Sequence, residues 1–354
     1  MDPSSLIVVF FTILLSLFCL IGNSLTIVAV SKDTRLKKSV TNYCVVSLAI
    51  ADIIVGAIII PFRGFYEFNQ RKWIFGDLFC DIWYATNIST CTASILNLCL
   101  ISLDRYVSIF DTLNYDSRLS RKKVIIYIFL IWIISILISF PAMIRSWIIG
   151  LNNGSDLSDR CMLFLSEKSY MMMICALTFY IPLIFMTYVY VKIYFKASKQ
   201  IKFMRSGTKV TNEISLRIHS SRKLNNDNHG FALERGDRGK RMDQRKCIRA
   251  KRTVCQRRWI SREDKAAKTL GIVFGAFLIC WLPFFIKFPI SMFTDTIGQP
   301  DFLLTLFGWF GWFNSCLNPV IYWFWSRDFR RAFKQVAVDV METLLHHDTS
   351  NDVI

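Results

Sequence analysis

Charged side chains are scarce in this chain of 354 residues, of which Asp, Glu, Lys and Arg together make up only 19%. A soluble domain typically has about a quarter. Hydrophobic residues make up 53%, and they fall in long runs separated by short polar stretches. A bilayer core about 30 Å thick needs roughly 20 apolar residues per crossing helix, and backbone groups in lipid must pair within that helix. The composition therefore predicts an all-α membrane protein embedded in a lipid bilayer.

Acidic residues are also few, 26 against 43 basic residues, which gives a net charge of +17. The basic residues are concentrated between Lys196 and Lys265 and beside the ends of apolar runs, whereas Thr294 to Gln299 contains none. Because Lys and Arg accumulate on cytoplasmic loops, this pattern predicts an extracellular N-terminus and a cytoplasmic C-terminus in the plasma membrane. No RNA- or DNA-binding module accompanies the charge, so nucleic acid is not a predicted partner.

Catalytic and metal-binding patterns are missing as well. The four histidines have no metal-ligand spacing, and no nucleophile–base motif is present, so neither a metal site nor an enzyme is predicted. No internal repeat relates the two halves of the chain, which argues against a transporter, and no filter sequence or ring of charge indicates a channel. A polytopic transporter remains the rival class.

Seven apolar runs are long enough to cross a bilayer as helices. Their predicted bounds are Leu6–Val30, Val40–Phe62, Phe79–Ile109, Val124–Ile149, Ser169–Tyr194, Ala266–Phe293 and Phe302–Trp325. Residues 197–263 are basic and polar, and we expect a largely disordered third cytoplasmic loop there. Ser326 to Val336 is predicted to form a short amphipathic eighth helix. Residues 1–336 would form the membrane domain and residues 337–354 a cytoplasmic tail, which we expect to be loose from His346 onward.

Ionisable residues inside apolar spans are costly and mark functional sites. Asp52 lies in the middle of the second span, and its possible partners all carry side-chain oxygen: Asn23, Ser94, Asn314, Ser315 and Asn318. A carboxylate among amide and hydroxyl oxygens suits a hydrated sodium ion, and it equally suits a hydrogen-bond network between helices. Both interpretations stay open.

The third span ends with Asp104-Arg105-Tyr106. Arg105 can pair with Asp104 and with Glu263, which precedes the sixth span, and such a pair is a breakable contact between two helices. The alternative is an arginine that simply extends to the membrane surface. Prolines inside the fifth, sixth and seventh spans each remove a backbone hydrogen bond and bend the helix: Pro182, Pro283 and Pro319.

Signature residues occur once per span and in order. They are Gly22-Asn23, Leu48-Ala49-Ile50-Ala51-Asp52, Asp104-Arg105-Tyr106, Trp132, Pro182 with Tyr190, Cys280-Trp281-Leu282-Pro283 and Asn318-Pro319-Val320-Ile321-Tyr322. From Leu6 to Val336 this set resembles the rhodopsin-like (class A) G-protein-coupled receptors. The resemblance implies a seven-helix receptor that binds an extracellular ligand and activates a heterotrimeric G protein, with arrestin and a receptor kinase as further partners.

The resemblance also assigns roles to individual residues. Cys80 and Cys161 would form a disulfide between the third span and the second outer loop. The packing switch beneath the ligand would comprise Ile95, Pro182 and Phe277, with Trp281 as the floor of the site. Tyr190 and Tyr322 would turn inward as Arg105 leaves Glu263 and the sixth helix moves outward.

Two glycosylation sequons occur in the chain, and their predicted positions differ. Asn153-Gly154-Ser155 lies on an outer loop, so we expect a glycan at Asn153. The other sequon, Asn87-Ile88-Ser89, lies inside a span and should stay unmodified.

Within the class, the chain is similar to biogenic-amine receptors in Cys80-Asp81-Ile82-Trp83, Cys91 to Asn97, Phe284-Phe285, and Trp309 with Gly311. The ligand site implied by this similarity comprises Asn87, Trp83, Ile88, Cys91, Ile174, Cys175, Thr178, Trp281, Phe284, Phe285, Trp309 and Trp312. The chain departs from the pattern at Asn87, which stands where amine receptors have the aspartate that holds the ligand ammonium. Trp312 replaces the tyrosine that steadies that aspartate, and Ile174, Cys175 and Thr178 replace a serine face.

These departures leave two interpretations of the ligand. A serotonin-, dopamine-, octopamine-, tyramine- or histamine-like amine could bind through cation–π contacts with Trp83, Trp281, Trp309 or Trp312, worth about 0.5–2 kcal/mol each. Alternatively, the receptor takes a non-amine ligand. Glu67, Glu167 and Asp301 could act as substitute anions, although an ordinary solvated loop charge is the preferred interpretation of each.

Overall fold

The computed structural model describes residues 3–153, 161, 168–196, 198–199, 269, 271–294 and 301–351. Every regular element in these ranges is a helix. Met1–Val189 and Thr269–Ile354 form one compact unit, and Tyr190–Lys268 forms another. All contacts below belong to the first unit. Most of the predicted third cytoplasmic loop lies outside the described residues, as does the predicted start of the sixth span at Ala266.

Six helices are long and apolar enough to span a membrane, judged by length and composition: Leu6–Lys32, Thr41–Phe68, Asp77–Phe110, Arg121–Pro141, Met171–Lys196 and Gly271–Phe293. The seventh, α11 (Phe302–Trp325), has the predicted bounds. Its mean hydropathy is lower than that of the others because the helix contains several Gly, Asn and Trp residues. The helices therefore match the seven predicted spans, and most of them extend a few residues further than predicted.

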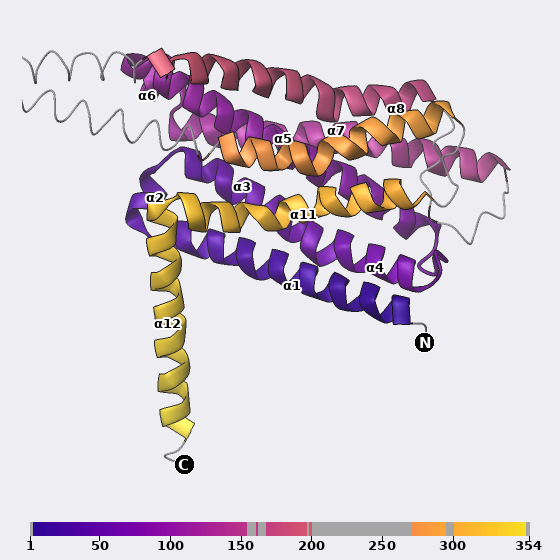
Figure 1. Cartoon of the computed structure of the whole chain (residues 1–354), viewed down its shortest axis with the longest axis horizontal. Helices are drawn as coiled ribbons and strands as arrows, with labels where there is room; N and C mark the ends of the chain where they lie inside the picture. Colours follow the sequence, from indigo (N-terminus) through magenta and orange to yellow (C-terminus); the bar gives the residue numbers. More distant parts are fainter. Residues whose placement is uncertain are drawn as a thin grey trace, which may run out of the picture. The chain divides into compact units, whose positions relative to one another are not determined.

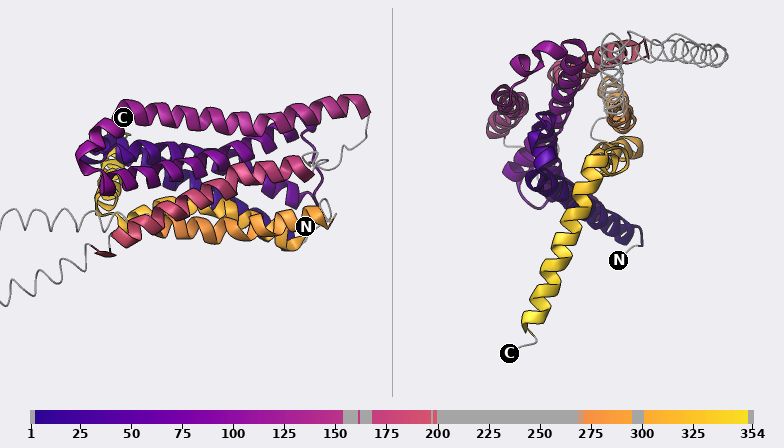
Figure 2. Two further views of the ribbon diagram at one scale, coloured as in Figure 1. Left: turned by 90° about the horizontal axis from the view of Figure 1, so that it is seen from above. Right: turned by 90° about the vertical axis from the view of Figure 1, so that its left-hand side faces the viewer.

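The elements of the first four spans, in chain order, are α1 (Pro3–Lys32), α2 (Thr34–Lys38), α3 (Thr41–Ile54), η1 (Val55–Ile59), α4 (Ile60–Phe68), α5 (Asp77–Phe110), η2 (Thr112–Asn114), α6 (Tyr115–Arg118) and α7 (Arg121–Asn153). The fifth span begins with α8 (Lys168–Cys175) and η3 (Ala176–Tyr180). The central helix is α5, which packs against both α3 and α7, while α1 packs against α3, α4 and α11 (Figures 1 and 2).

Two of the spans contain a π-helical turn just before a proline. The turn η1 precedes Pro61, and η3 precedes Pro182. A proline lacks an amide hydrogen and its ring clashes with the preceding turn, so a locally widened turn lets the helix continue through it. The second span therefore continues beyond its predicted end at Phe62 as far as Phe68.

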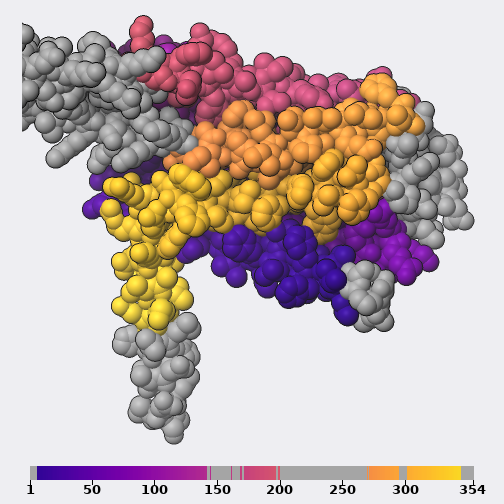
Figure 3. Space-filling model, in the orientation of Figure 1, coloured from indigo at the N-terminus to yellow at the C-terminus, as the bar shows by residue number. Residues whose placement is uncertain are grey.

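The eighth helix, α12 (Arg327–Asn351), is longer than predicted. It leaves the end of α11 at an angle (Figures 1 and 3). The prediction that it ends at Val336, with a loose tail from His346, is wrong, since the helix continues to Asn351. An ion pair between Lys32 Nζ of α1 and Asp339 Oδ2 at 2.8 Å holds the part of α12 beyond the predicted end.

Aromatic packing holds the first turns of α12 against α11. Phe329 stacks on Tyr322 and Phe333 stacks on Trp323, with ring centroids 5.0 and 6.2 Å apart. Phe333 is 3% exposed. The angle between the two helices is therefore fixed by buried side chains.

We expect Phe333→Ala to lower the free energy of unfolding by about 3 kcal/mol, because it removes a buried aromatic side chain. The matched control is Phe324→Ala, since Phe324 is 60% exposed. Thermal unfolding of the purified receptor measures both. Equal losses in the two variants would contradict the packing assigned to Phe333.

Candidate functional site

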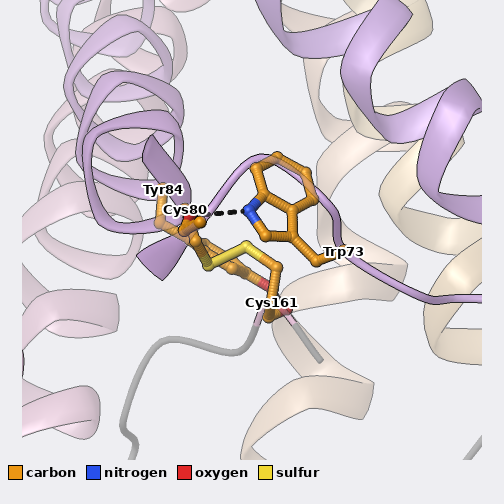
Figure 4. The surroundings of a disulfide bond; sticks show 5 residues. Trp73, Cys80, Tyr84 and Cys161 are labelled. Atoms are coloured by element: carbon orange, nitrogen blue, oxygen red, sulfur yellow. Dashed lines mark hydrogen bonds between the residues drawn. A yellow bond between two sulfur atoms is a disulfide. The ribbon is translucent and has the colours of Figure 1, made fainter. Parts of the chain in front are cut away.

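The N-terminal end of α5 is linked by a disulfide between Cys80 and Cys161, the pair predicted from the sequence. Their Cα atoms lie 5.5 Å apart. Trp73 lies beside the bridge, and its indole nitrogen donates a hydrogen bond to the Gly76 carbonyl (Figure 4). The hydroxyl of Tyr84 contacts the Cys161 carbonyl at 3.5 Å. Cys161 is thereby held against the N-terminal end of α5, where the predicted ligand site begins.

The two atypical residues of the predicted site contact each other directly. Trp312 Nε1 donates a hydrogen bond to Asn87 Oδ1 at 3.0 Å, and the Cys91 thiol contacts the same oxygen at 3.6 Å. An indole N–H can only donate, so the atom of Asn87 that faces it is the amide oxygen. Nδ2 of Asn87 makes no hydrogen bond to any described residue. What Asn87 offers to a ligand is therefore an N–H donor.

The predicted aromatic residues separate into two groups. Trp281, Phe284 and Phe285 pack together, with Trp281 5.8 Å from Phe285 and 6.1 Å from Phe284 between ring centroids. Trp309 and Trp312 meet edge to face at 5.4 Å. Trp83 belongs to the second group, in a buried cluster with Trp312, Trp73 and the disulfide.

Sequence reasoning missed Phe179, which is fully buried and stacks on Phe285 with ring centroids 4.0 Å apart. Phe179 lies in the widened turn η3, where a regular helical period no longer assigns side chains to faces. It supports the sixth helix from the side of the fifth.

The predicted ligand positions on the fifth helix, Ile174, Cys175 and Thr178, offer few polar groups to a ligand. Thr178 donates its hydroxyl to the Ile174 carbonyl of its own helix at 2.9 Å. Ile174 is buried beside Met171 and Met292, with Ile88 packed against this cluster. Cys175 is 2% exposed. This face is apolar, as the residues replacing a serine face predict.

The substitute anions considered from the sequence are already engaged. Glu67 lies in α4 with 14% of its side chain exposed, and it pairs with Arg63 and Arg71. Asp301 caps α11 and pairs with Lys287 at 2.8 Å. The Lys287 ammonium and the Leu304 amide hold the pKa of Asp301 below its usual value. The interpretation of Glu67 and Asp301 as plain solvated charges is therefore wrong, while Glu167 lies outside the described residues.

Arg63 was missed because the second span was predicted to end one residue before it. Its Nη2 donates to Glu67 Oε1, and its Cζ lies 5.9 Å from the Trp312 ring and 5.4 Å from the Tyr66 ring. The signal in the sequence is the spacing of Arg63, Glu67 and Arg71 at four-residue intervals, which places them on one face if the helix continues. The guanidinium of Arg63 therefore lies beside the group formed by Trp83, Trp309 and Trp312.

A polar network crosses the middle of the bundle at Asp52, which is fully buried. Asn318 Nδ2 donates to Asp52 Oδ2 at 2.8 Å, and Asn23 Nδ2 donates to the Ser315 carbonyl at 3.0 Å. Asp52 Oδ1 and Ser94 Oγ are buried without a hydrogen-bond partner among the described residues. Asn314 is also buried, in the same stretch of α11.

The C-terminal end of α5, predicted to face the cytoplasm, carries a second polar cluster, centred on Asp104. This carboxylate accepts from Thr41 Oγ1 at 2.6 Å, from Tyr115 Oη at 2.6 Å and from Arg105 Nε at 2.9 Å. Arg105 also contacts Thr41. Burial and the neighbouring carboxylate raise the pKa of the Tyr115 hydroxyl above its usual value, which keeps it a donor. Glu263 lies outside the described residues.

The remaining switch residues occupy the interior. Ile95 is 2% exposed and Phe277 1% exposed, and Pro182 is buried. Tyr322 is buried under Phe329. Tyr190 lies in the helix Met171–Lys196, in the second unit. The helix α7 ends at Asn153, so the rest of that sequon lies outside the described residues.

Residues 22–322 match the family model described as the seven-transmembrane receptor (rhodopsin family). The chain is 35% identical over 379 residues to dopamine receptor 2 of Drosophila melanogaster, covering 91% of this chain and 69% of that receptor. It is 34% identical to the octopamine receptor beta-2R of Chilo suppressalis, covering 91% of this chain and 77% of that receptor. It is 32% identical to the human alpha-1A adrenergic receptor, covering 91% and 66%.

The chain belongs to the rhodopsin family of G-protein-coupled receptors, in its biogenic-amine branch. It is accordingly a multi-pass protein of the plasma membrane and a receptor rather than an enzyme. These findings confirm the predicted class, while the assignment of individual site residues stays a prediction.

Trp281 packs so closely on α11 that only glycine fits opposite it. A Cβ atom at Gly311 would lie 2.7 Å from Cζ3 of the Trp281 ring, whereas one at Gly308 would lie 3.9 Å from Trp312. Contacts of 2.7 Å are not tolerated, so a larger residue at Gly311 must displace the indole.

We therefore expect Gly311→Ala to destabilise the receptor by about 1–3 kcal/mol through overpacking, and to change basal nucleotide exchange on the G protein. Gly308→Ala is the matched control in the same helix and should leave both unchanged or raise stability slightly. Thermal unfolding and basal exchange in membranes measure the two effects. A Gly311→Ala variant that resembles Gly308→Ala would rule out the close contact.

Proposed function

We propose that this receptor binds a small extracellular ligand of the biogenic-amine class and activates a heterotrimeric G protein. The observation that carries the proposal is the similarity to dopamine, octopamine and adrenergic receptors over about nine-tenths of the chain. The ligand would lie between α5, the helix Gly271–Phe293 and α11, with Trp281 beneath it. An extracellular N-terminus with a glycan at Asn153, and a cytoplasmic C-terminus that meets the G protein, arrestin and a receptor kinase, complete the proposal.

Activation would proceed by outward movement of the helix Gly271–Phe293. Two contacts support a two-state arrangement: Trp281 against Gly311 below the ligand, and the Asp104–Arg105 pair at the cytoplasmic end. A ligand that fits only one position of Trp281 would shift the population toward the corresponding state. Arg105 would leave its contacts with Asp104 and Thr41, and Glu263 if paired, to meet the G protein.

A non-amine ligand is the second candidate, and the environment of Asn87 favours it. The aspartate that would form a charge-assisted bond with an ammonium is absent, and such a bond is about twice as strong as a neutral one. The oxygen of Asn87 already accepts from Trp312. An amine would have to rely on cation–π contacts with the tryptophans.

The two candidates are separated by agonist-driven nucleotide exchange in cells, with a panel of biogenic amines applied to the wild type and to Asn87→Asp. If an amine acts on the wild type at low concentration, the aromatic residues hold the ammonium. If amines act only on Asn87→Asp, with at least about a tenfold gain from the restored charge-assisted bond, the amine site has lost its anchor. Silence in both variants at normal surface expression would refute the amine proposal.

We also propose that Asp52, Ser94, Asn314, Ser315 and Asn318 can hold a sodium ion with water. The support is chemical: Asp52 Oδ1 and Ser94 Oγ are buried oxygens without a partner among the described residues, and a hard cation prefers oxygen ligands. When bound, the ion would neutralise the buried carboxylate. The alternative is a network completed by water alone.

We expect sodium chloride to raise the melting temperature of the purified wild type by a few degrees relative to choline chloride at equal ionic strength, because an ion that binds only the folded state stabilises it. Ser94→Ala should reduce this shift. The control is Ser139→Ala, which removes a buried hydroxyl on α7. A shift that is equal in all three proteins would argue against a site at Asp52.

A further inference from the structure

The charge at the ligand end of the receptor is inverted relative to the amine pattern. The expected aspartate is the neutral Asn87, and the half-buried cation Arg63 lies beside the tryptophan that contacts Asn87. Trp312 contacts both Arg63 and Asn87. The Cζ atom of Arg63 lies 5.9 Å from the centroid of the Trp312 ring, and the indole N–H of Trp312 donates to Asn87. Asn87 and Trp312 occupy the positions of the amine-receptor aspartate and tyrosine, whereas Arg63 belongs to none of the signature residues.

Arg63 has a hydrogen-bond donor that its ion pair with Glu67 does not use. Its side chain is 16% exposed, and its Nε is buried without a hydrogen-bond partner among the described residues. The carboxylate that it contacts, Glu67, is shared with Arg71, whose Nε lies 3.0 Å from it. Two guanidinium groups and one carboxylate leave a net charge of +1 at the end of α4 and in the turn that follows it, together with one unused donor.

The neighbouring donors point to the same type of ligand group. Trp83 Nε1 is likewise buried without a hydrogen-bond partner among the described residues. Asn87 has its oxygen engaged by Trp312 and offers Nδ2. Buried donors are costly unless an acceptor satisfies them. Two buried donors without a partner among the described residues, a further donor on the half-buried Asn87 and an excess positive charge therefore favour a ligand with acidic oxygen.

We propose that the ligand of this receptor carries a carboxylate, and that Arg63 binds it. The proposal deepens the proposed function, on whose small extracellular ligand it rests. A guanidinium binds a carboxylate through charge-assisted hydrogen bonds and presents its donors in a fixed planar arrangement that an ammonium lacks. A ligand that also has an amine would place its ammonium against the aromatic residues, away from Arg63, which would repel it.

The test uses sets of probes that share one ring and differ only in their charged groups. One set is tyramine, 4-hydroxyphenylacetate and tyrosine, and the second is tryptamine, indole-3-acetate and tryptophan. Binding to the purified receptor is measured by thermal shift and by nucleotide exchange in membranes. We expect a carboxylate-bearing probe to bind the wild type at least about tenfold more tightly than its amine counterpart without a carboxylate.

Four variants assign that preference to Arg63. Arg63→Gln should abolish the preference for carboxylates, and Arg63→Lys should restore part of it, because charge is kept without the planar donors. Arg71→Gln is the matched control, since it removes the other partner of Glu67 and should keep the preference. Asn87→Asp places a carboxylate within the site, and we expect it to weaken the binding of carboxylate probes about tenfold and to favour amines. This last variant tests the proposal even if Arg63→Gln fails to fold.

The possible results distinguish the two proposals. If amines bind and a carboxylate adds nothing, or if Arg63→Gln keeps the preference, the role of Arg63 is refuted and the amine proposal stands. If acids without an amine bind through Arg63, the role of Arg63 stands and the amine proposal fails. If no carboxylate-bearing probe binds the folded wild-type receptor, the proposal for Arg63 is overturned.

Discussion

The structure depends on one constraint, which is that polar groups inside lipid must find partners within the protein. Side chains reach across helices to meet it. Trp132 Nε1 donates to Ser47 Oγ at 3.1 Å, Ser16 Oγ donates to the Gly56 carbonyl at 2.6 Å, and Asn318 donates to Asp52. Each bond fixes two helices in register, so the polar residues determine which of many apolar packings the chain adopts.

The same constraint explains how Asn87 and Trp312 can replace the aspartate and the tyrosine of the amine-receptor pattern. An indole N–H between α5 and α11 needs an acceptor, and the amide oxygen of Asn87 supplies it. The pair holds the two helices together as a tyrosine–aspartate pair would, but it does so without a negative charge. The exchange therefore keeps the helix contact while it removes the negative charge, and the cation Arg63 lies 5.9 Å from the centroid of the Trp312 ring.

Much of the fold could be predicted from the sequence because long apolar runs admit few alternatives. The bounds of α11 and the disulfide pair agree with the prediction. The predicted second span ended too early because Arg63, the next residue, is charged. The spacing of apolar residues cannot show that a helix continues through charged residues such as Arg63 and Glu67, which form an ion pair with each other. The length of α12 was missed for a related reason, since the contact of Lys32 with Asp339 joins residues far apart in the chain.

The site itself was less predictable than the fold, as Phe179 and Arg63 show. Phe179 lies in a π-helical turn, which shifts the face on which a side chain lies, and Pro182 after that turn predicted only a bend in the helix. The contact of Arg63 with Trp312 depends on how α4 and α11 approach each other. Motifs identified Asn87 and Trp312 as departures from the amine pattern, whereas Arg63 and Phe179 belong to no motif and are found only through their contacts in the fold.

A single helix, α11, connects the ligand end of the receptor to its polar centre. It carries Trp312 beside Asn87, Gly311 beneath Trp281, and Asn318 on Asp52. Pro319 removes a backbone hydrogen bond one residue further on, so the helix can bend at this point. Trp312 and Asn318 therefore lie on one continuous helix that can bend near Pro319, so a displacement of Trp312 can reach the Asp52 carboxylate through this single element.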